Sequence, residues 1–237
     1  MRKYLIINAD DFGASTGVNR GILECHTRGI VTSTSLMVTG RAVAEAVSIS
    51  RDHPRLDVGL HWDIWGEEDE LGFDINDLIA VRDEFRQQVD KFYCLLGRMP
   101  THIDSHRHVH LRGKLLPVFR ELVEPLGVPL RYDSRVRCVG GFYAQWEWMV
   151  TDLEHVSVPA LQRMLHEEVD EGWTEFLCHP GYRSPDFTSV YLRERETEVH
   201  TLTDPRIRHT IEQLGICLAS YADYLAAGVG VNDPYHR

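Results

Sequence analysis

Hydrophobic and polar positions follow one another in two alternating patterns along the chain. Short apolar runs predict strands at residues 4–7, 56–63, 128–132, 174–178 and 216–218, and a segment rich in threonine and serine predicts another at 30–38. Between them, apolar residues recur at helical spacing and predict helices at about 16–29, 42–49, 76–96, 115–126, 159–169, 204–214 and 221–225. Strands that alternate with helices in this way indicate a parallel sheet covered by helices. With no linker or internal repeat, residues 1–237 are expected to form a single α/β domain.

Three further segments do not follow these two patterns. Residues 190–200 are rich in charge and predict an exposed helix, whereas residues 133–158 show no clear pattern beyond a turn at Gly140 and Gly141. In that second segment Trp146 and Trp148 either line a pocket or cover the core, and covering the core is the favoured interpretation. The acidic residues 66–70 predict a solvated loop or a lid that faces the substrate.

Polar residues gather at the carboxyl ends of four strands, namely three of those above and a fourth that is expected to begin just after Pro100. They are Asp10 and Asp11, His61, His106, and His179. Taken singly, adjacent aspartates could cap a helix and each histidine could be structural, although Ser15 or Thr16 is also placed to cap the first helix. Parallel sheets place their active sites at the carboxyl ends of the strands, so agreement among four strand ends predicts one functional site.

The segment 101–110 concentrates potential metal ligands. Its even positions from 102 onward are all ionisable: His102, Asp104, His106, His108 and His110. Pro100 disfavours a helix at the start of this segment, and in a strand the alternate side chains would share one face. A strand nevertheless spaces these side chains too far apart for all five to reach one ion, so other strands must contribute to any metal site.

An aspartate with two histidines leaves a coordination position for water, which is typical of a catalytic metal site. Such an ion polarises a carbonyl group and acidifies bound water, and this suits hydrolysis of an amide or ester. A nearby carboxylate can take the proton from that water, and a histidine can protonate the departing amine. The residues alone leave two other functions open. One is a metal phosphoesterase, which would need two metals and cationic residues such as Arg107; the other is a metal-binding or sugar-binding protein without turnover.

The charge and composition of the chain limit the classes of partner and the cellular location that we expect. The formal net charge of -11 argues against nucleic acid or an anionic membrane as the main partner. The chain has no apolar run of about 18 residues and no signal-peptide pattern, so we expect a cytoplasmic protein. Its five cysteines are scattered without a Cys-x-x-Cys pair and predict reduced, mostly buried thiols. Any exposed tryptophans would be candidates for an interface in a homo-oligomer.

Four motifs occur in order along the chain: Asn8-Ala9-Asp10-Asp11-Phe12-Gly13, Gly59-Leu60-His61, Thr101-His102-Ile103-Asp104-Ser105-His106 with Val109-His110, and Cys178-His179-Pro180-Gly181. With residues 193–196 and 202–205, they make the chain resemble the YdjC-like carbohydrate deacetylases, the family of chitooligosaccharide deacetylase, from Tyr4 to Tyr224. The resemblance implies a distorted (β/α) barrel, similar to a TIM barrel. It also implies removal of acetyl from an N-acetylated amino sugar or short chitin-type oligosaccharide.

The same resemblance implies one divalent metal ion and a role for each motif residue. Asp11, His61 and His106 would be the ligands, Asp10 the general base, and His179 the group that assists the leaving amine or the oxyanion. His102, Asp104, His108 and His110 would then support the site or contact the substrate. One aspartate with two histidines suits zinc, manganese, cobalt or nickel, and magnesium if water fills most positions.

The chain departs from the family pattern in two places. The family often has three consecutive histidines where this chain has His106-Arg107-His108. We expect Arg107 on the opposite strand face from His106, which would leave the metal site intact. After His61 the family tends to have a Thr-x-Gly-x-Pro type of turn, whereas this chain has Trp62-Asp63-Ile64-Trp65-Gly66. Stacking on a sugar ring and burial explain these tryptophans equally well.

Overall fold

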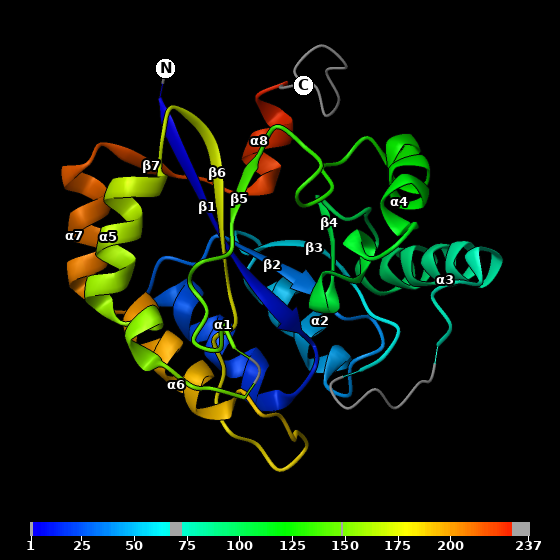
Figure 1. Cartoon of the computed structure of the whole chain (residues 1–237), viewed down its shortest axis with the longest axis horizontal. Helices are drawn as coiled ribbons and strands as arrows, with labels where there is room; N and C mark the ends of the chain where they lie inside the picture. Colours follow the sequence, from blue (N-terminus) through cyan, green and yellow to red (C-terminus); the bar gives the residue numbers. More distant parts are fainter. Residues whose placement is uncertain (1, 67–72, 148, 229–237) are drawn as a thin grey trace.

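The computed structural model describes residues 2–66, 73–147 and 149–228. Within them, one sheet contains parallel strands β1 (Lys3–Phe12), β2 (Ser33–Leu36), β3 (Asp57–Trp62), β4 (Ile103–Ser105), β5 (Arg137–Val139), β6 (Gly172–Cys178) and β7 (Ile216–Leu218). Neighbouring strands follow the order β4-β3-β2-β1-β6-β5, and β7 pairs with β1. Helices surround this open half-barrel (Figure 1), so the predicted α/β fold with a distorted barrel is confirmed.

The central strand β1 organises the sheet because both of its edges are paired. β6 pairs with residues 3–9 along one edge. The other edge is shared, since β7 pairs with residues 3–5 and β2 pairs from Asn8 onward. All of these pairs are parallel, so the carboxyl ends of the strands lie at one side of the sheet.

The helices are α1 (Thr16–Thr27), α2 (Val43–Asp52), α3 (Leu78–Leu96), α4 (Leu115–Val123), α5 (Val158–Glu168), α6 (Leu192–Leu202), α7 (Pro205–Gln213) and α8 (Tyr221–Ala226), with short 3-10 helices η1 (His106–Leu111), η2 (Glu124–Leu126) and η3 (Leu153–Val156). The Ser15 side chain accepts a hydrogen bond from the backbone N–H of Val18 and caps α1. The two aspartates that precede α1 are therefore not needed as its cap.

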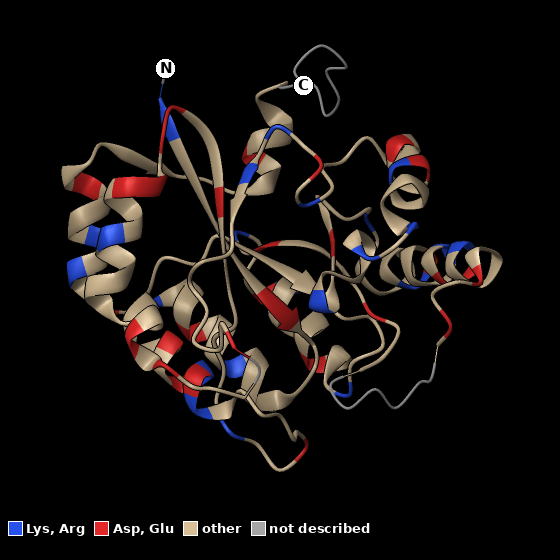
Figure 2. Ribbon diagram, in the orientation of Figure 1, with Lys and Arg blue, Asp and Glu red and all other residues tan. Residues whose placement is uncertain are grey.

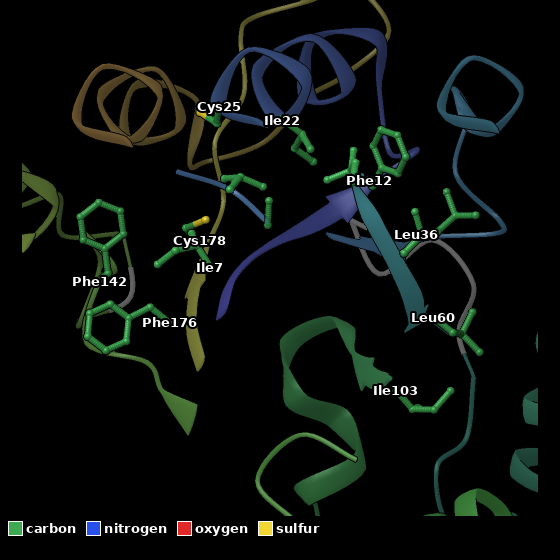
Figure 3. Packing of buried hydrophobic residues seen from close by; sticks show 14 of the residues in the cluster. Ile7, Phe12, Ile22, Cys25, Leu36, Leu60, Ile103, Phe142, Phe176 and Cys178 are labelled. Carbon is green, nitrogen blue, oxygen red and sulfur yellow. The ribbon is translucent and has the colours of Figure 1, made fainter. Parts of the chain in front are cut away.

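The main hydrophobic core lies between the sheet and the helices. Figure 3 shows Ile22 and Cys25 of α1 directed toward the strand that carries Ile7 and Phe12. Burying each such aliphatic or aromatic side chain stabilises the fold by roughly 1.5–3 kcal/mol. Leu5, Ile7 and Ala9 belong to this core, whereas Ile6 belongs to a small separate cluster with Tyr221 and Tyr224. The odd positions of β1 thus face the helices, and the even positions face the other side of the sheet.

One strand was predicted in the wrong place. Residues 128–132 form only an isolated bridge, between Leu130 and Ile103. Tyr132 has a φ of 62°, in the left-handed region, and this ends the extended chain there. The actual strand β5 lies within residues 133–158, where no pattern was visible because the strand has only three residues.

Two predictions about exposure were also wrong. The charged helix α6 buries Glu194, Arg195 and Glu198, because these side chains have partners inside the protein. Trp146 does not cover the core: it is 66% exposed and lines a small pocket beside α5. Trp148 and residues 67–70 of the acidic segment lie outside the described residues.

The cysteines and the charges fit the expectations in part. All five cysteines are free, but only Cys25 and Cys178 are buried, and Cys94 is exposed. Figure 2 shows acidic and basic segments mixed on the outer helices, and acidic segments on strands β1, β4 and β6 inside the sheet. No helix within the described part of the chain is both long and apolar enough to cross a membrane.

Candidate active site

A pocket of about 690 Å³ opens at the carboxyl ends of the strands. All five of the residues predicted for the site line it: Asp10, Asp11, His61, His106 and His179. They come from β1, β3, the start of η1 and the loop after β6. A volume of this size lies within the usual range for sites that bind small molecules.

Two consecutive aspartates face this pocket because β1 is distorted where they occur. The pairing register between β1 and β2 shifts between Ala9 and Phe12, and Asp11 has a φ of 67°. On a regular strand Asp11 would point toward the helices with Ala9, while Asp10 would point to the opposite side. The bulge turns the Asp11 side chain back, so both carboxylates reach one cavity.

Asp11, His61 and His106 form a group with the donor atoms of a metal site. Their potential ligand atoms all lie within 4.8 Å of one another. Asp11 Oδ1 is 3.2 Å from His61 Nε2 and 3.1 Å from His106 Nδ1. His61 Nε2 is buried and has no hydrogen-bond partner among the described residues. These donor atoms fit a divalent ion.

The second nitrogen of His61 is held by Asp104. His61 Nδ1 lies 2.7 Å from Asp104 Oδ1, and both side chains are buried. A carboxylate in this position keeps the proton on Nδ1 and directs Nε2 toward a metal. Burial by itself lowers the pKa of His61, but Asp104 and Asp11 outweigh it and hold that pKa well above its usual value. The surroundings of His61 therefore favour a positive charge, which a proton or a metal ion can supply.

Asp10 has a different partner, the buried guanidinium of Arg131. Its two oxygens lie 2.7 Å from Arg131 Nη1 and 2.7 Å from Nη2. Burial opposes ionisation of Asp10, yet Arg131 outweighs burial, and the pKa of Asp10 falls below its usual value. Arg131 also pairs with Asp104 and Glu175, both at 2.7 Å. Asp10 is therefore an ionised carboxylate beside the metal group.

A second possible metal group consists of Asp10, His61 and Asp104. It shares His61 with the first group, and Arg131 already forms ion pairs with both of its carboxylates. Burying a second cation next to this guanidinium would add like-charge repulsion. The first group is accordingly the better candidate of the two to hold an ion.

His179 lines the pocket close to Asp10. Its Nε2 is 3.9 Å from Asp10 Oδ2, and its ring packs edge-on against Tyr143 and Tyr191. Burial lowers the pKa of His179 to about 4, so the imidazole is neutral near pH 7. The loop that carries it packs closely on α1, since a Cβ at Gly21 would lie 2.5 Å from Gly181 Cα.

The histidine segment 101–110 does not continue as a strand, so its even positions do not share one face. β4 ends at Ser105, and Arg107 and His108 adopt left-handed φ angles of 51° and 50°. Arg107 was expected opposite His106, but it lines the same pocket, as does His108. His102 stacks on Tyr221, while His110 bonds with Ser105 and the backbone oxygen of Arg131. Neither of these last two histidines is among the residues that line the pocket.

Sequence reasoning missed two arginines, Arg131 and Arg195. Arg131 is 1% exposed, and its presence in the short apolar run 128–132 was the available signal, because a buried charge requires a partner. Arg195 gave no such signal, because it lies in a charged helix that looked solvent-exposed. It pairs with Asp11 Oδ2 at 2.6 Å.

Glu198 leads to a prediction about stability and pH. It accepts hydrogen bonds from His179 N–H and Tyr191 Oη. Burial raises its pKa from 4.5 to about 8, although these bonds and Arg195 act in the opposite direction and Asp10 adds to the rise. The unfolded chain would ionise Glu198 near pH 4.5 and the folded chain only near pH 8, so this group lowers stability progressively as pH rises through that window.

Replacing Glu198 by glutamine should remove this pH-dependent loss. The Tm of Glu198→Gln minus that of the wild type should therefore increase between pH 5 and pH 8, as followed by circular dichroism. Glu196→Gln on the same helix is the control, because Glu196 is half-exposed and should show no such trend. A Tm difference that stays constant across the range would contradict the expectation.

Comparisons with known proteins find a matching family and individual relatives. A family model described as YdjC-like protein matches residues 4–213. A chitooligosaccharide deacetylase from Serratia marcescens is 32% identical to this chain in an alignment of 260 positions, gaps included. The alignment covers 94% of this chain and 100% of that protein.

Two solved structures share the fold. A protein from Enterococcus faecalis, for which cellobiose-phosphate cleavage has been suggested, is 30% identical with a TM-score of 0.80, over 94% of this chain and 99% of that one. A family 4 carbohydrate esterase from Streptomyces lividans in complex with acetate has a TM-score of 0.58 over 98% of both chains. At 14% identity this second likeness concerns the fold alone.

Proposed function

Because this chain belongs to the YdjC-like protein family, we propose that it is a metal-dependent carbohydrate N-deacetylase. It would remove the acetyl group from an N-acetylated amino sugar or a short chitin-type oligosaccharide by hydrolysis. One observation carries the proposal: Asp11 lies with two histidines, while the adjacent Asp10 is held by Arg131 and remains available as a base. The Serratia marcescens relative supports the class of substrate.

The metal would be held by Asp11, His61 and His106. Zinc or magnesium are the first candidates, and manganese, cobalt or nickel would also suit these donors. When bound, the ion would polarise the acetyl carbonyl group and make a water molecule more acidic. Asp104 would assist by keeping His61 in the tautomer that presents Nε2.

Asp10 would act as the general base. Arg131 keeps its carboxylate ionised and fixes its orientation through two hydrogen bonds. In the proposed reaction Asp10 accepts a proton from the water that attacks the acetyl carbon. General-base catalysis of this kind contributes about 10²–10⁴-fold to a rate.

His179 would assist at the oxygen or at the departing nitrogen of the acetyl amide group. Its neutral imidazole can donate an N–H to the oxyanion that develops on the acetyl oxygen. In the alternative role Nε2 is unprotonated and lies 3.9 Å from Asp10 Oδ2, so the proton taken by Asp10 would pass to Nε2 and on to the nitrogen as the C–N bond breaks. The products would be acetate and the free amino sugar.

The phosphoesterase alternative is less well supported. Such enzymes commonly use two metals, whereas the second possible group here has its carboxylates bound to Arg131. Arg107 and Arg112 do line the pocket, so a sugar that carries a phosphate remains a second candidate substrate for deacetylation. The suggestion made for the Enterococcus faecalis protein points to the same class of sugar.

The test is an acetate-release screen over N-acetylated mono- and oligosaccharides, with and without a phosphate group, in the presence of each candidate metal. We expect acetate and free amine in equal amounts, loss of activity after chelation, and recovery when one metal is restored. Inorganic phosphate is measured in the same samples. Release of phosphate without acetate would favour the phosphoesterase, and sugar binding without any product would favour a binding protein.

A further inference from the structure

Arg195 connects two parts of the proposed site that are far apart in the sequence. Its Nη2 donates to Asp11 Oδ2 at 2.6 Å, and its Nη1 donates to the backbone oxygen of His179 at 3.3 Å. The residue is only 3% exposed. One guanidinium therefore touches both a proposed metal ligand and the main chain of the proposed catalytic histidine.

The position of this guanidinium is fixed by its surroundings. Its central carbon lies 5.4 Å from the ring centre of Phe187 and 5.9 Å from that of Tyr191. One turn further along α6, Glu198 accepts the N–H of His179 and the hydroxyl of Tyr191. Helix α6 thus holds the backbone of His179 by both its N–H and its carbonyl group.

Because of this contact, the two carboxylate oxygens of Asp11 have different partners. Oδ1 faces His61 and His106, and Oδ2 is bonded to Arg195. A carboxylate held in this way presents a single oxygen to the metal group and cannot rotate freely. Arg131 makes the comparable contact with Asp10, so each of the adjacent aspartates is oriented by its own arginine.

We propose that Arg195 is a positioning residue that fixes Asp11 for metal binding. The proposal rests on the proposed metal site, but not on the substrate. Two effects compete: orientation of Asp11 raises metal affinity, whereas the positive charge of Arg195 repels the ion. Partners of metal ligands typically change affinity by 10–100-fold, so orientation should outweigh repulsion.

The test measures the dissociation constant of zinc by competition with a chromophoric chelator, without any sugar. Arg195→Met should weaken zinc binding by about 10–100-fold. Arg195→Lys keeps the charge but loses the fork that bonds two oxygens, so it should also weaken binding, by a smaller factor. Arg193→Met is the matched control, because Arg193 is exposed on the same helix and should leave the affinity unchanged.

Unchanged or tighter zinc binding by Arg195→Met would overturn the proposal. If that variant does not fold, as judged by its melting curve, Arg195→Lys decides: weaker binding supports the proposal, and wild-type affinity overturns it. The result is independent of acetate release by the wild type. Failure of Arg195 as a positioning residue and failure of the proposed deacetylase activity can therefore be told apart.

Discussion

Replacement of Asp10 by asparagine should lower the kcat for acetate release by about 10²–10⁴-fold, because the proposed reaction would lose its general base. Asparagine has nearly the same shape, and its side-chain oxygen can still accept a hydrogen bond from Arg131. Arg131 also keeps Asp104 and Glu175 as partners. We therefore expect the zinc affinity to stay close to that of the wild type.

The measurement pairs initial rates of acetate release with zinc affinity on the same preparations. Asp57→Asn is a suitable control, because Asp57 is also buried but lies at the opposite end of β3, away from the pocket. An Asp10→Asn enzyme that keeps more than a tenth of the wild-type turnover would rule out Asp10 as the base. Loss of zinc together with activity would instead make Asp10 a ligand.

Replacement of Asp11 by alanine should abolish both metal content and acetate release, and His61→Ala should do the same. The two remaining ligands would have no charge to offset that of the ion, and Arg195 would lose its ion pair with Asp11. Asp11→Asn removes the carboxylate charge with less strain on the backbone, since asparagine tolerates the left-handed φ of 67° better than alanine does.

For Asp11→Asn we expect zinc affinity to fall by more than the 10–100-fold typical of residues that only support a ligand. Metal content after dialysis, measured by plasma mass spectrometry, and acetate release report on the same protein. A normal melting curve for Asp11→Asn would show that the loss is local. Full metal content in this variant would exclude Asp11 as a ligand.

The residues of the candidate site could be predicted from the sequence where their positions follow directly from the topology of the sheet. Strand ends in a parallel sheet converge, so Asp10, His61 and His179 could be placed in one site from their positions after apolar runs. The roles assigned to them remain predictions. The long helices were also predictable, because their apolar stripes extend over several turns, as in α3.

What could not be predicted depends on contacts between distant residues. Arg131 and Arg195 lie 121 and 184 positions from the aspartates that they bond. Periodicity cannot reveal such pairs. The helix α6 was predicted to be exposed because charged residues usually face solvent, whereas several of its charged side chains have partners inside the protein. The turn at Arg107 and His108 was equally hidden, since residues other than glycine seldom adopt positive φ angles.

The bulge in β1 makes the site sensitive to the number of residues, and not only to their identity. β1 advances three residues from Ala9 to Phe12 while β2 advances two, so deleting one residue here would restore strict alternation, and one carboxylate would turn into the apolar layer beneath α1. An uncompensated charge there costs several kcal/mol. A protein engineer who transplants this Asp-Asp pair to another barrel would therefore have to transfer the irregular backbone with it, because an ideal strand cannot present both carboxylates to one cavity.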